Sequence, residues 1–276
     1  MTMYEIYERD AAGYDALVAA EDHAGNLCRA LREIVVWTDA LVVEAGIGTG
    51  RVTRCYIDAA RTVHGFDRST HMLARAAENL GVLAPGGDAG SDGDAIAGGD
   101  ATSRRDADGS ASGRVHLAVA EHRSLPVADG TADIVVEGWA FGHAITDAAE
   151  GALREQEQGA RDAAVASAIT TTTNELIAEA RRVLRPGGSM IIIETLGTNV
   201  GSPRAPLPSL ARFYRELEER YGFTRVTIRT DYRFNSAEEA AERCGFFFGS
   251  EMGRAVAASG SATVPEFTGI WWARLV

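Results

Sequence analysis

Three glycines stand at alternate positions, the first of them two residues after an acid, in the segment EAGIGTG at residues 44–50. Glycine has no Cβ, so a turn of this kind lets the backbone bend sharply and lie close to a bound ligand. A dinucleotide-binding turn, G-x-G-x-x-G, needs its third glycine at position 51, which holds Arg51. Apolar residues at helical spacing over 52–59 predict a following helix whose amino end faces the ligand. The segment therefore indicates a ligand-binding turn and counts against a dinucleotide.

A second acid stands at the end of another apolar run. Asp67 follows Gly46 by about 20 residues, the spacing at which a carboxylate at the end of a second strand reaches a ribose diol. The alternative for Asp67 is a helix cap, but Ser69 and Thr70 lie nearer to the expected start of the helix. Both roles are compatible, and we expect Asp67 to contact a ribose.

Two further turns carry polar and aromatic side chains. In the segment AEHRSLPVADGTAD at residues 120–133, Glu121 offers a carboxylate that suits an amino-group donor, with His122 beside it. A solvated acid and a surface histidine are the alternatives. The segment EGWAFGH ends at His143, a candidate general base because imidazole titrates near neutral pH, with a structural histidine as the alternative. Candidate substrate-binding side chains, each with ordinary packing as the alternative, are Tyr14, Trp139, Phe141, Glu194 and Tyr232.

Strands and helices must position these turns. Short apolar runs predict strands, and apolar residues at helical spacing predict helices. The expected strands are 40–44, 62–66, 115–119, 132–136, 189–194, 224–230 and 269–276, and the expected helices after the first turn include 70–80, 176–184, 210–221 and 237–248. This alternation predicts an α/β fold with a doubly wound, mostly parallel, seven-stranded sheet and helices on both faces.

The chain divides into two expected regions, an N-terminal helical cap at 1–36 and a ligand-binding domain at 37–276. Two segments of biased composition interrupt the second region. Residues 84–114 are mostly Gly, Ala, Ser and Asp, which predicts a disordered surface insertion, with a functional acidic arm as the alternative. Residues 147–173 are alanine-rich and predict a helical extension.

A helix stop gives the most specific family signal. The segment EARRVLRPGG at 179–188, followed by an apolar strand, resembles a hallmark of the class I S-adenosylmethionine (SAM) dependent methyltransferases of the UbiE-like group. The turn at 44–50 and the segment 120–133 resemble the same family. The resemblance implies SAM as cofactor, S-adenosylhomocysteine as product, and cofactor contacts from Glu44, Ala45, Gly46, Gly48, Asp67, Arg68, Met72, Glu121, His122 and Glu137. It names no catalytic residue, because the family has no universal one.

The resemblance implies an enzyme that transfers a methyl group from SAM to a small-molecule acceptor. Two other functions stay open. A SAM-binding regulatory protein without turnover would keep the same cofactor residues. An NAD(P)-dependent oxidoreductase is less favoured, because Arg51 replaces the third glycine and no separate substrate domain is evident.

Composition restricts the partners and the location. The formal net charge of the 276 residues is −12, and every basic residue is arginine, since the chain has no lysine. A net negative surface repels phosphate backbones, so we expect no nucleic-acid partner. No apolar run approaches a membrane span and no signal segment is evident, which predicts a cytoplasmic location. We also expect a monomer or a homodimer, with no membrane partner. The acid-rich, lysine-free composition also suggests the hypothesis of a halophilic host.

The three cysteines, Cys28, Cys55 and Cys244, are widely spaced and form no CxxC pair. This spacing indicates neither a metal site nor a disulfide framework. We therefore expect three unpaired thiols and no bound metal.

Overall fold

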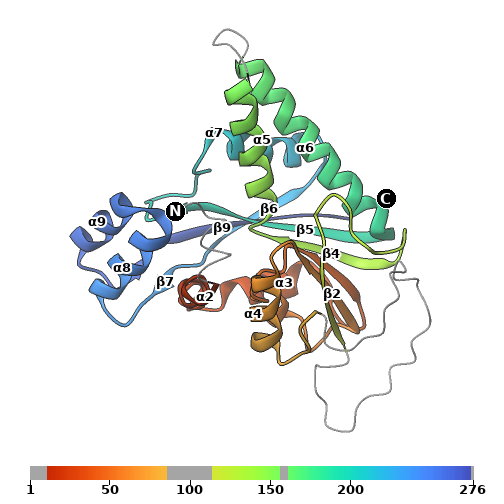
Figure 1. Cartoon of the computed structure of the whole chain (residues 1–276), viewed down its shortest axis with the longest axis horizontal. Helices are drawn as coiled ribbons and strands as arrows, with labels where there is room; N and C mark the ends of the chain where they lie inside the picture. Colours follow the sequence, from red (N-terminus) through yellow and green to blue (C-terminus); the bar gives the residue numbers. More distant parts are fainter. Residues whose placement is uncertain (1–10, 86–113, 156–160, 275–276) are drawn as a thin grey trace.

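A seven-stranded sheet lies at the centre of the molecule, with helices on both faces (Figure 1). The computed structural model describes residues 11–85, 114–155 and 161–274. The sheet strands are β1 (Leu41–Ala45), β2 (Thr62–Asp67), β3 (Val115–Val119), β4 (Ala132–Gly138), β5 (Leu184–Thr198), β6 (Thr224–Arg229) and β9 (Glu266–Arg274), in the order β3-β2-β1-β4-β5-β9-β6. The strands β1 to β5 pair in parallel, whereas β9 is antiparallel to β5 and β6. The predicted doubly wound, mostly parallel sheet is confirmed.

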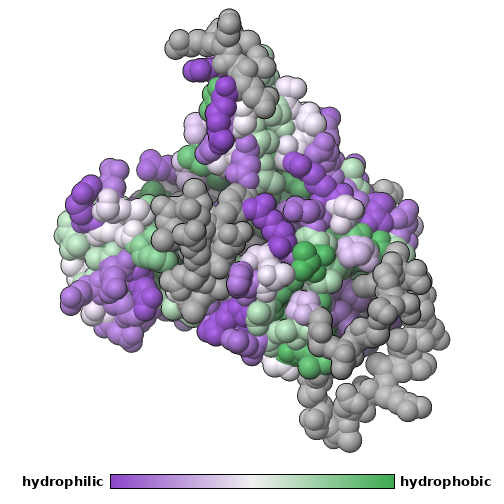
Figure 2. All heavy atoms as spheres, in the orientation of Figure 1, coloured by the Kyte–Doolittle hydropathy of each residue, from purple (hydrophilic) through white to green (hydrophobic). Residues whose placement is uncertain are grey.

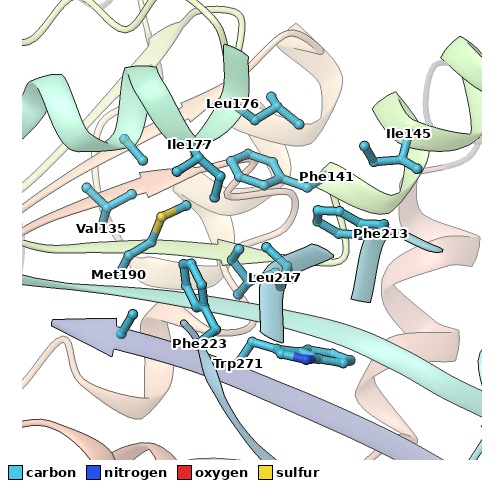
Figure 3. Close-up of a cluster of buried hydrophobic side chains, with 14 of the residues drawn as sticks. Val135, Phe141, Ile145, Leu176, Ile177, Met190, Phe213, Leu217, Phe223 and Trp271 are labelled. Carbon is cyan, nitrogen blue, oxygen red and sulfur yellow. The ribbon is translucent and has the colours of Figure 1, made fainter. Parts of the chain in front are cut away.

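Side chains point alternately to the two faces of the sheet along each strand, and each face has its own hydrophobic core. Val43 and Val135 belong to one core, whereas their neighbours Val42 and Ile134 belong to the other. The helices α5 (Phe141–Glu155), α6 (Arg161–Val183) and α7 (Pro208–Glu219) close the first core. Figure 3 shows its side chains between these helices and the sheet. The second core lies under α3 (Asn26–Ile34) and the short 3₁₀ helix η1 (Thr53–Cys55), and α4 (Thr70–Leu80) lies on the same side of the sheet.

The helix that we expected directly after the glycine turn is absent from the structure. Residues 51–60 form turns around η1 instead of an α-helix. Two side chains of this segment point inward, since Thr53 Oγ1 and the Tyr56 hydroxyl both donate to the buried Glu44 carboxylate. The expectation from apolar spacing was wrong here, because these polar contacts and a covalent link at Cys55 fix the segment.

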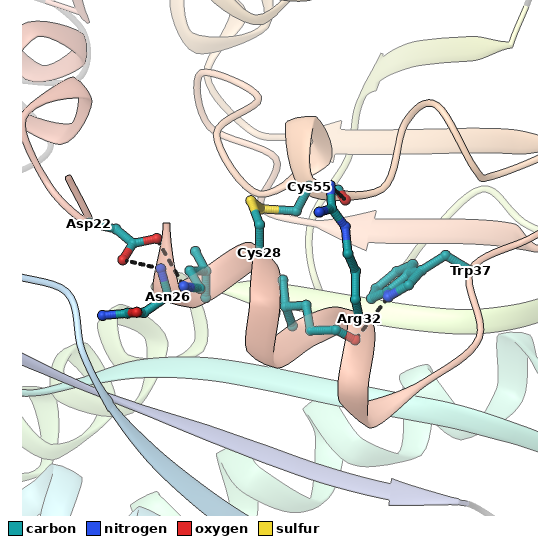
Figure 4. The surroundings of a disulfide bond; sticks show 8 residues. Asp22, Asn26, Cys28, Arg32, Trp37 and Cys55 are labelled. Atoms are coloured by element: carbon teal, nitrogen blue, oxygen red, sulfur yellow. Dashed lines mark hydrogen bonds between the residues drawn. A yellow bond between two sulfur atoms is a disulfide. The ribbon is translucent and has the colours of Figure 1, made fainter. Parts of the chain in front are cut away.

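A disulfide joins Cys28 of α3 to Cys55 of η1 (Figure 4). The same junction is held by the indole of Trp37, which donates to the carbonyl of Leu31 and stacks 4.3 Å from the ring of Tyr56. Cys244 is a free buried thiol. The prediction of three unpaired thiols is therefore wrong for Cys28 and Cys55. Sequence spacing could not show that α3 packs against the segment after the glycine turn.

The C-terminal part differs from the simple alternation that we expected. The predicted β6 and α8 (Ala237–Phe248) are confirmed, but a further helix, α9 (Ser250–Ser259), follows α8 directly. A two-stranded sheet, β7 (Tyr232–Arg233) and β8 (Thr263–Val264), brackets the two helices. With Leu17 of α2 (Ala11–Ala19) they form a third hydrophobic cluster beside the main sheet (Figure 1). The segment between β6 and β9 is therefore a small unit of its own.

The segments of biased composition are only partly described. Residues 86–113 of the acidic segment 84–114 lie outside the described residues, so the expectation of disorder is not tested. The alanine-rich extension 147–173 falls within α5 and α6, apart from residues 156–160, which are also outside the described part. The face of the molecule in Figure 2 is a mosaic of hydrophilic and hydrophobic residues. In the described part of the chain, every helix is too short or too polar to cross a membrane.

Candidate active site

A cavity of about 450 Å³ opens where the carboxyl ends of β1, β2, β3 and β4 meet. This is the edge of a doubly wound sheet at which ligands bind. Helices α2, α4 and α5 contribute the remaining walls. The predicted site residues that line the cavity are Tyr14, Gly46, Gly48, Asp67, Arg68, Met72, Glu121, His122, Trp139 and His143.

The glycine turn forms one wall through its backbone. Gly46 has φ +82°, in the left-handed region that side chains other than glycine rarely adopt. A Cβ at Gly46 would overlap the Cβ of Ala140 and press against the ring of His122. The amides of Gly46 and Ile47 both donate to the carbonyl of Phe66 at the end of β2, at 2.8 Å each. These hydrogen bonds hold the turn against the end of β2, and the absence of side chains at Gly46 and Gly48 leaves the cavity open.

Asp67 ends β2 and lines the cavity. One carboxylate oxygen accepts from the Gly48 amide at 3.0 Å, and the other accepts from the Ser69 amide at 2.9 Å. Burial raises the pKa of Asp67, and these two backbone hydrogen bonds oppose the shift. The cap of α4 comes from Ser69, whose Oγ accepts from the Met72 amide. Asp67 therefore braces the glycine turn and still faces the cavity.

The turn after β3 is anchored by the helix that bears the family signature. Arg182 of α6 donates to the carbonyls of Leu125 and Val127, at 2.9 and 2.8 Å. Glu179, one turn earlier on α6, accepts from the Leu125 amide at 2.7 Å and from the Arg182 guanidinium. The segment EARRVL thus holds the turn that carries Glu121 and His122 against the cavity. This gives a physical role to a motif that contains no cavity-lining residue.

Two histidines lie in the cavity wall. His122 packs edge-on to Phe141, with ring centroids 5.6 Å apart. Burial, together with the charges of Arg68, His143 and Arg123, lowers the pKa of His122 to about 4. Burial also lowers the pKa of His143, against the opposing charge of Asp147 one turn later on α5. Both imidazoles are therefore neutral at pH 7.

Trp139 contributes an aromatic wall in a strained backbone conformation. Its φ is +54°, uncommon for a residue with a side chain and costly by about 1–3 kcal/mol. Its amide donates to the carbonyl of Ile193 on β5 at 2.8 Å. Arg51 stacks its guanidinium over the indole, 4.3 Å from the ring centroid. Local strain of this kind is typical of functional sites.

Six predicted site residues are placed away from the cavity wall, namely Glu44, Ala45, Glu137, Phe141, Glu194 and Tyr232. Glu44 is buried and turns toward Thr53 and Tyr56, as described above. Burial raises the pKa of Glu44 to about 7. Glu44 thus supports the glycine turn from within the core, and its side chain is not among the residues that line the cavity.

Glu137 and Glu194 hold the amino end of α5. The Glu137 carboxylate accepts from the amides of Ala140 and Phe141, and Glu194 accepts from the Gly142 amide at 2.6 Å. Burial and the neighbouring Glu194 charge raise the pKa of Glu137 well above its usual range, and burial raises the pKa of Glu194 to about 8. These two acids position the helix that carries His143, and they do not face the cavity.

Phe141 and Tyr232 are core residues in the structure. Phe141 is 1% exposed and lies in the first core (Figure 3). Tyr232 is 5% exposed and belongs to the third cluster, near Glu21 and Arg51. Ordinary packing was the alternative to substrate binding for both residues, and the tertiary structure uses them for packing.

Several cavity residues escaped the sequence reasoning. They are Arg123, Gly138, Ala140, Ala144, Asp147 and Ala148. Ala144, Asp147 and Ala148 follow His143 by one, four and five residues on α5, so helical periodicity from His143 was a usable signal. Arg51 was also missed as a contributor, because its position in the motif was read only as a missing glycine.

Two solved structures share this fold over most of the chain. One is phosphoethanolamine N-methyltransferase 2 of Haemonchus contortus, in complex with phosphomonomethylethanolamine and S-adenosylhomocysteine, with 14% identity and a TM-score of 0.51, covering 100% of this chain and 61% of that one. The other is a provisionally named type II methyltransferase of Anaeromyxobacter dehalogenans, with 14% identity and a TM-score of 0.50, covering 90% of this chain and 95% of that one.

The chain has the class I methyltransferase fold. In sequence, it is 34% identical over 80 residues to an uncharacterised methyltransferase of Geobacillus thermodenitrificans (strain NG80-2). That match covers 29% of this chain and spans 36% of the relative's length. No family model matches the chain. The resemblance predicted from the motifs thus holds at the level of the methyltransferase fold.

Proposed function

We propose that this protein is an enzyme that transfers a methyl group from SAM to a small-molecule acceptor. The observation that carries the proposal is the convergence of a backbone-only glycine wall, the Asp67 carboxylate and the turn at Glu121 in one cavity of about 450 Å³. That volume lies within the range of about 300–1,000 Å³ typical of small-molecule sites. The donors and acceptors of these residues fit an adenosine joined to an amino acid.

Each part of the cavity has a role in this proposal. The Gly46–Gly48 backbone would hold the methionine part of SAM, Asp67 the ribose hydroxyls, and Glu121 the adenine amino group. Arg68, Met72 and His122 would complete the contacts. Bound SAM supplies an activated methyl group. The protein contributes the alignment of the acceptor and the exclusion of water, which together lower the barrier substantially.

His143 is the proposed general base for an acceptor that carries a proton. It lines the cavity, is neutral at pH 7, and lies one helical turn before Asp147, whose charge stabilises the protonated imidazole. Tyr14 and Trp139 line the same cavity and are the proposed contacts to the acceptor. A methyl transfer of this kind requires no metal ion.

A cytoplasmic location, a monomeric or homodimeric state and the absence of a nucleic-acid partner complete the proposal, as predicted from the sequence. The Cys28–Cys55 disulfide counts against a cytoplasmic location, because disulfides are rare in reducing compartments. Trapping the thiols at the moment of cell lysis and counting them by mass spectrometry would decide whether the bond exists in the cell.

Calorimetric titration tests the function. We expect SAM and S-adenosylhomocysteine to bind and NAD not to bind. Turnover is then assayed as S-adenosylhomocysteine formation against a panel of hydroxyl, amine, thiol and carbon-acid metabolites. Binding of NAD in preference to SAM would overturn the assignment. Binding of SAM with no turnover on any panel member would favour a regulatory protein.

A further inference from the structure

A second cavity lies between α7, the segment that precedes it and the edge strand β6. Its volume is about 260 Å³, and its walls come from the end of β5, the segment that follows β5, α7 and β6. The two cavities share no residue among those that the structure describes. A ligand in the second cavity would therefore not contact the residues of the proposed cofactor site.

Three arginines line this second cavity. Arg204 comes from the segment between β5 and α7, Arg215 from α7 and Arg225 from β6. Among the described lining residues the one carboxylate is Glu218, which already accepts from the Trp271 indole at 2.9 Å and pairs with Arg225 at 3.2 Å. Within the described part of the chain, the guanidinium groups of Arg204 and Arg215 form no ion pair or hydrogen bond.

This gathering of cations stands out in an acidic chain. The formal net charge of the protein is −12, and arginines such as Arg51, Arg182 and Arg229 are each paired with a carboxylate. Arg204, Arg215 and Arg225 are exposed in the free protein, so an anion that enters the cavity can reach all three side chains. Arg204 and Arg215 are thus the two cations of the cavity whose charge is left for a ligand.

The floor of the cavity is fixed. The Tyr214 hydroxyl donates to the Thr195 carbonyl at 3.0 Å, and the Tyr214 ring lies 4.4 Å from the Trp271 ring. The Arg204 amide donates to the Leu196 carbonyl at 2.7 Å, which ties the arginine-bearing segment to β5. Leu196 itself and two alanines give the cavity apolar surface. A ligand with a compact anionic group and a small apolar body matches these walls.

We propose that this cavity is a second binding site, which takes a small molecule with a phosphate group. Guanidinium forks match the oxygen geometry of phosphate and give strong, charge-assisted hydrogen bonds. The volume lies just below the range of about 300–1,000 Å³ for larger organic ligands, so a phosphate monoester of few carbons fits. Inorganic phosphate carries the same chemistry without the apolar body.

The proposal is tested by titrating the full-length protein with phenyl phosphate and, separately, with inorganic phosphate. Binding is followed by calorimetry at low ionic strength, in the presence of saturating S-adenosylhomocysteine, so that the first cavity is filled. The variants are Arg204→Gln, Arg215→Gln and their combination. The matched control is Arg254→Gln, because Arg254 is another exposed arginine, on α9, away from both cavities. Unchanged melting temperatures establish that all variants fold.

We expect phenyl phosphate to bind more tightly than inorganic phosphate. Each single substitution should weaken binding about tenfold, and the double substitution should abolish it, while Arg254→Gln changes it less than twofold. Absence of binding, or equal weakening in the control, would overturn the site. If inorganic phosphate binds more tightly than phenyl phosphate, the proposal that the ligand is a phosphate monoester is wrong. If S-adenosylhomocysteine itself does not bind, the proposed function fails, and the anion titration still tests this site.

Discussion

The guanidinium of Arg51 lies 4.3 Å from the centroid of the Trp139 ring, so the residue after the glycine turn supports the aromatic wall at the end of β4. Arg51 also pairs with Glu21 at 2.7 Å, and the Glu21 side chain is only 4% exposed. One buried ion pair therefore links the segment after α2 to the glycine turn and to a wall of the cavity.

Removal of one partner of this ion pair should destabilise the protein. Arg51→Gln leaves the buried Glu21 carboxylate without its cation, and we expect a loss of about 3 kcal/mol in the free energy of unfolding. The double variant Glu21→Gln with Arg51→Gln should recover more than half of that loss, because no buried charge is left unpaired. Urea unfolding measures both. Arg54→Gln, an exposed neighbour, is the control, and equal stability of Arg51→Gln and the control would contradict the role of the pair.

Asp67 should decide cofactor affinity if the proposed function is right. We expect Asp67→Ala to weaken SAM binding by more than tenfold, because a hydrogen bond to a charged group contributes about 1.5–3 kcal/mol. The same carboxylate accepts from the amides of Gly48 and Ser69, so Asp67→Asn, which retains an acceptor oxygen, should lose less affinity than Asp67→Ala. Calorimetry gives the dissociation constants, and the exposed Asp58→Ala is the control. A dissociation constant that Asp67→Ala leaves unchanged would refute the ribose contact.

His143 should affect turnover without affecting cofactor binding. Once the panel has given an acceptor with an ionisable proton, we expect His143→Gln to lower kcat by about 10²–10⁴, the usual contribution of a general base. The affinity for S-adenosylhomocysteine should change less than twofold. Because the pKa of His143 is lowered, wild-type kcat should reach its plateau below pH 7 and fall only in more acidic solution. A kcat that is unaffected by the substitution would remove His143 from the mechanism.

Glu44 should make the protein less stable as the pH rises. Burial raises its pKa from 4.5 to about 7, so the folded state binds a proton more tightly than the unfolded state does. The stabilisation is complete below pH 4.5 and is lost as the pH rises through 7. Glu44→Gln has no proton to lose at this position. Its free energy of unfolding, relative to that of the wild type, should therefore rise by about 3 kcal/mol between pH 5 and pH 8. Urea unfolding at several pH values measures this difference in stability. The exposed Glu33→Gln is the control, and its stability should follow that of the wild type at every pH. The same behaviour in Glu44→Gln would contradict the prediction.

The Cys28–Cys55 disulfide should contribute measurably to stability. It closes a loop with a sequence separation of 27, for which the loss of chain entropy in the unfolded state corresponds to about 3–4 kcal/mol. A reductant should lower the urea midpoint of the wild type and leave a Cys28→Ala, Cys55→Ala double variant unchanged. Alkylation of the unreduced protein should label Cys244 alone after unfolding. Three labelled thiols would show that the bond does not form.

The sequence by itself determined the sheet and the turns that meet at its edge. Runs of apolar residues specify buried parallel strands because both faces of such a sheet are covered, and Gly46 and Asp67 could be assigned to strand ends by their positions after those runs. The end of α6 was predicted from a proline and two glycines, whose backbone preferences are local, although these residues belong to the first part of β5 in the structure. These features depend on neighbours in the chain, so they can be read without the fold.

Only the tertiary structure decided which way the polar side chains point. Glu44 and Glu137 lie near the ends of adjacent strands, as Asp67 does, yet both turn into the core to accept hydrogen bonds from η1 and from the start of α5. The pairing of Cys28 with Cys55 and the stacking of Arg51 on Trp139 likewise join segments far apart in the sequence. Such contacts depend on how distant elements pack, and residue type and local spacing carry no information about that geometry.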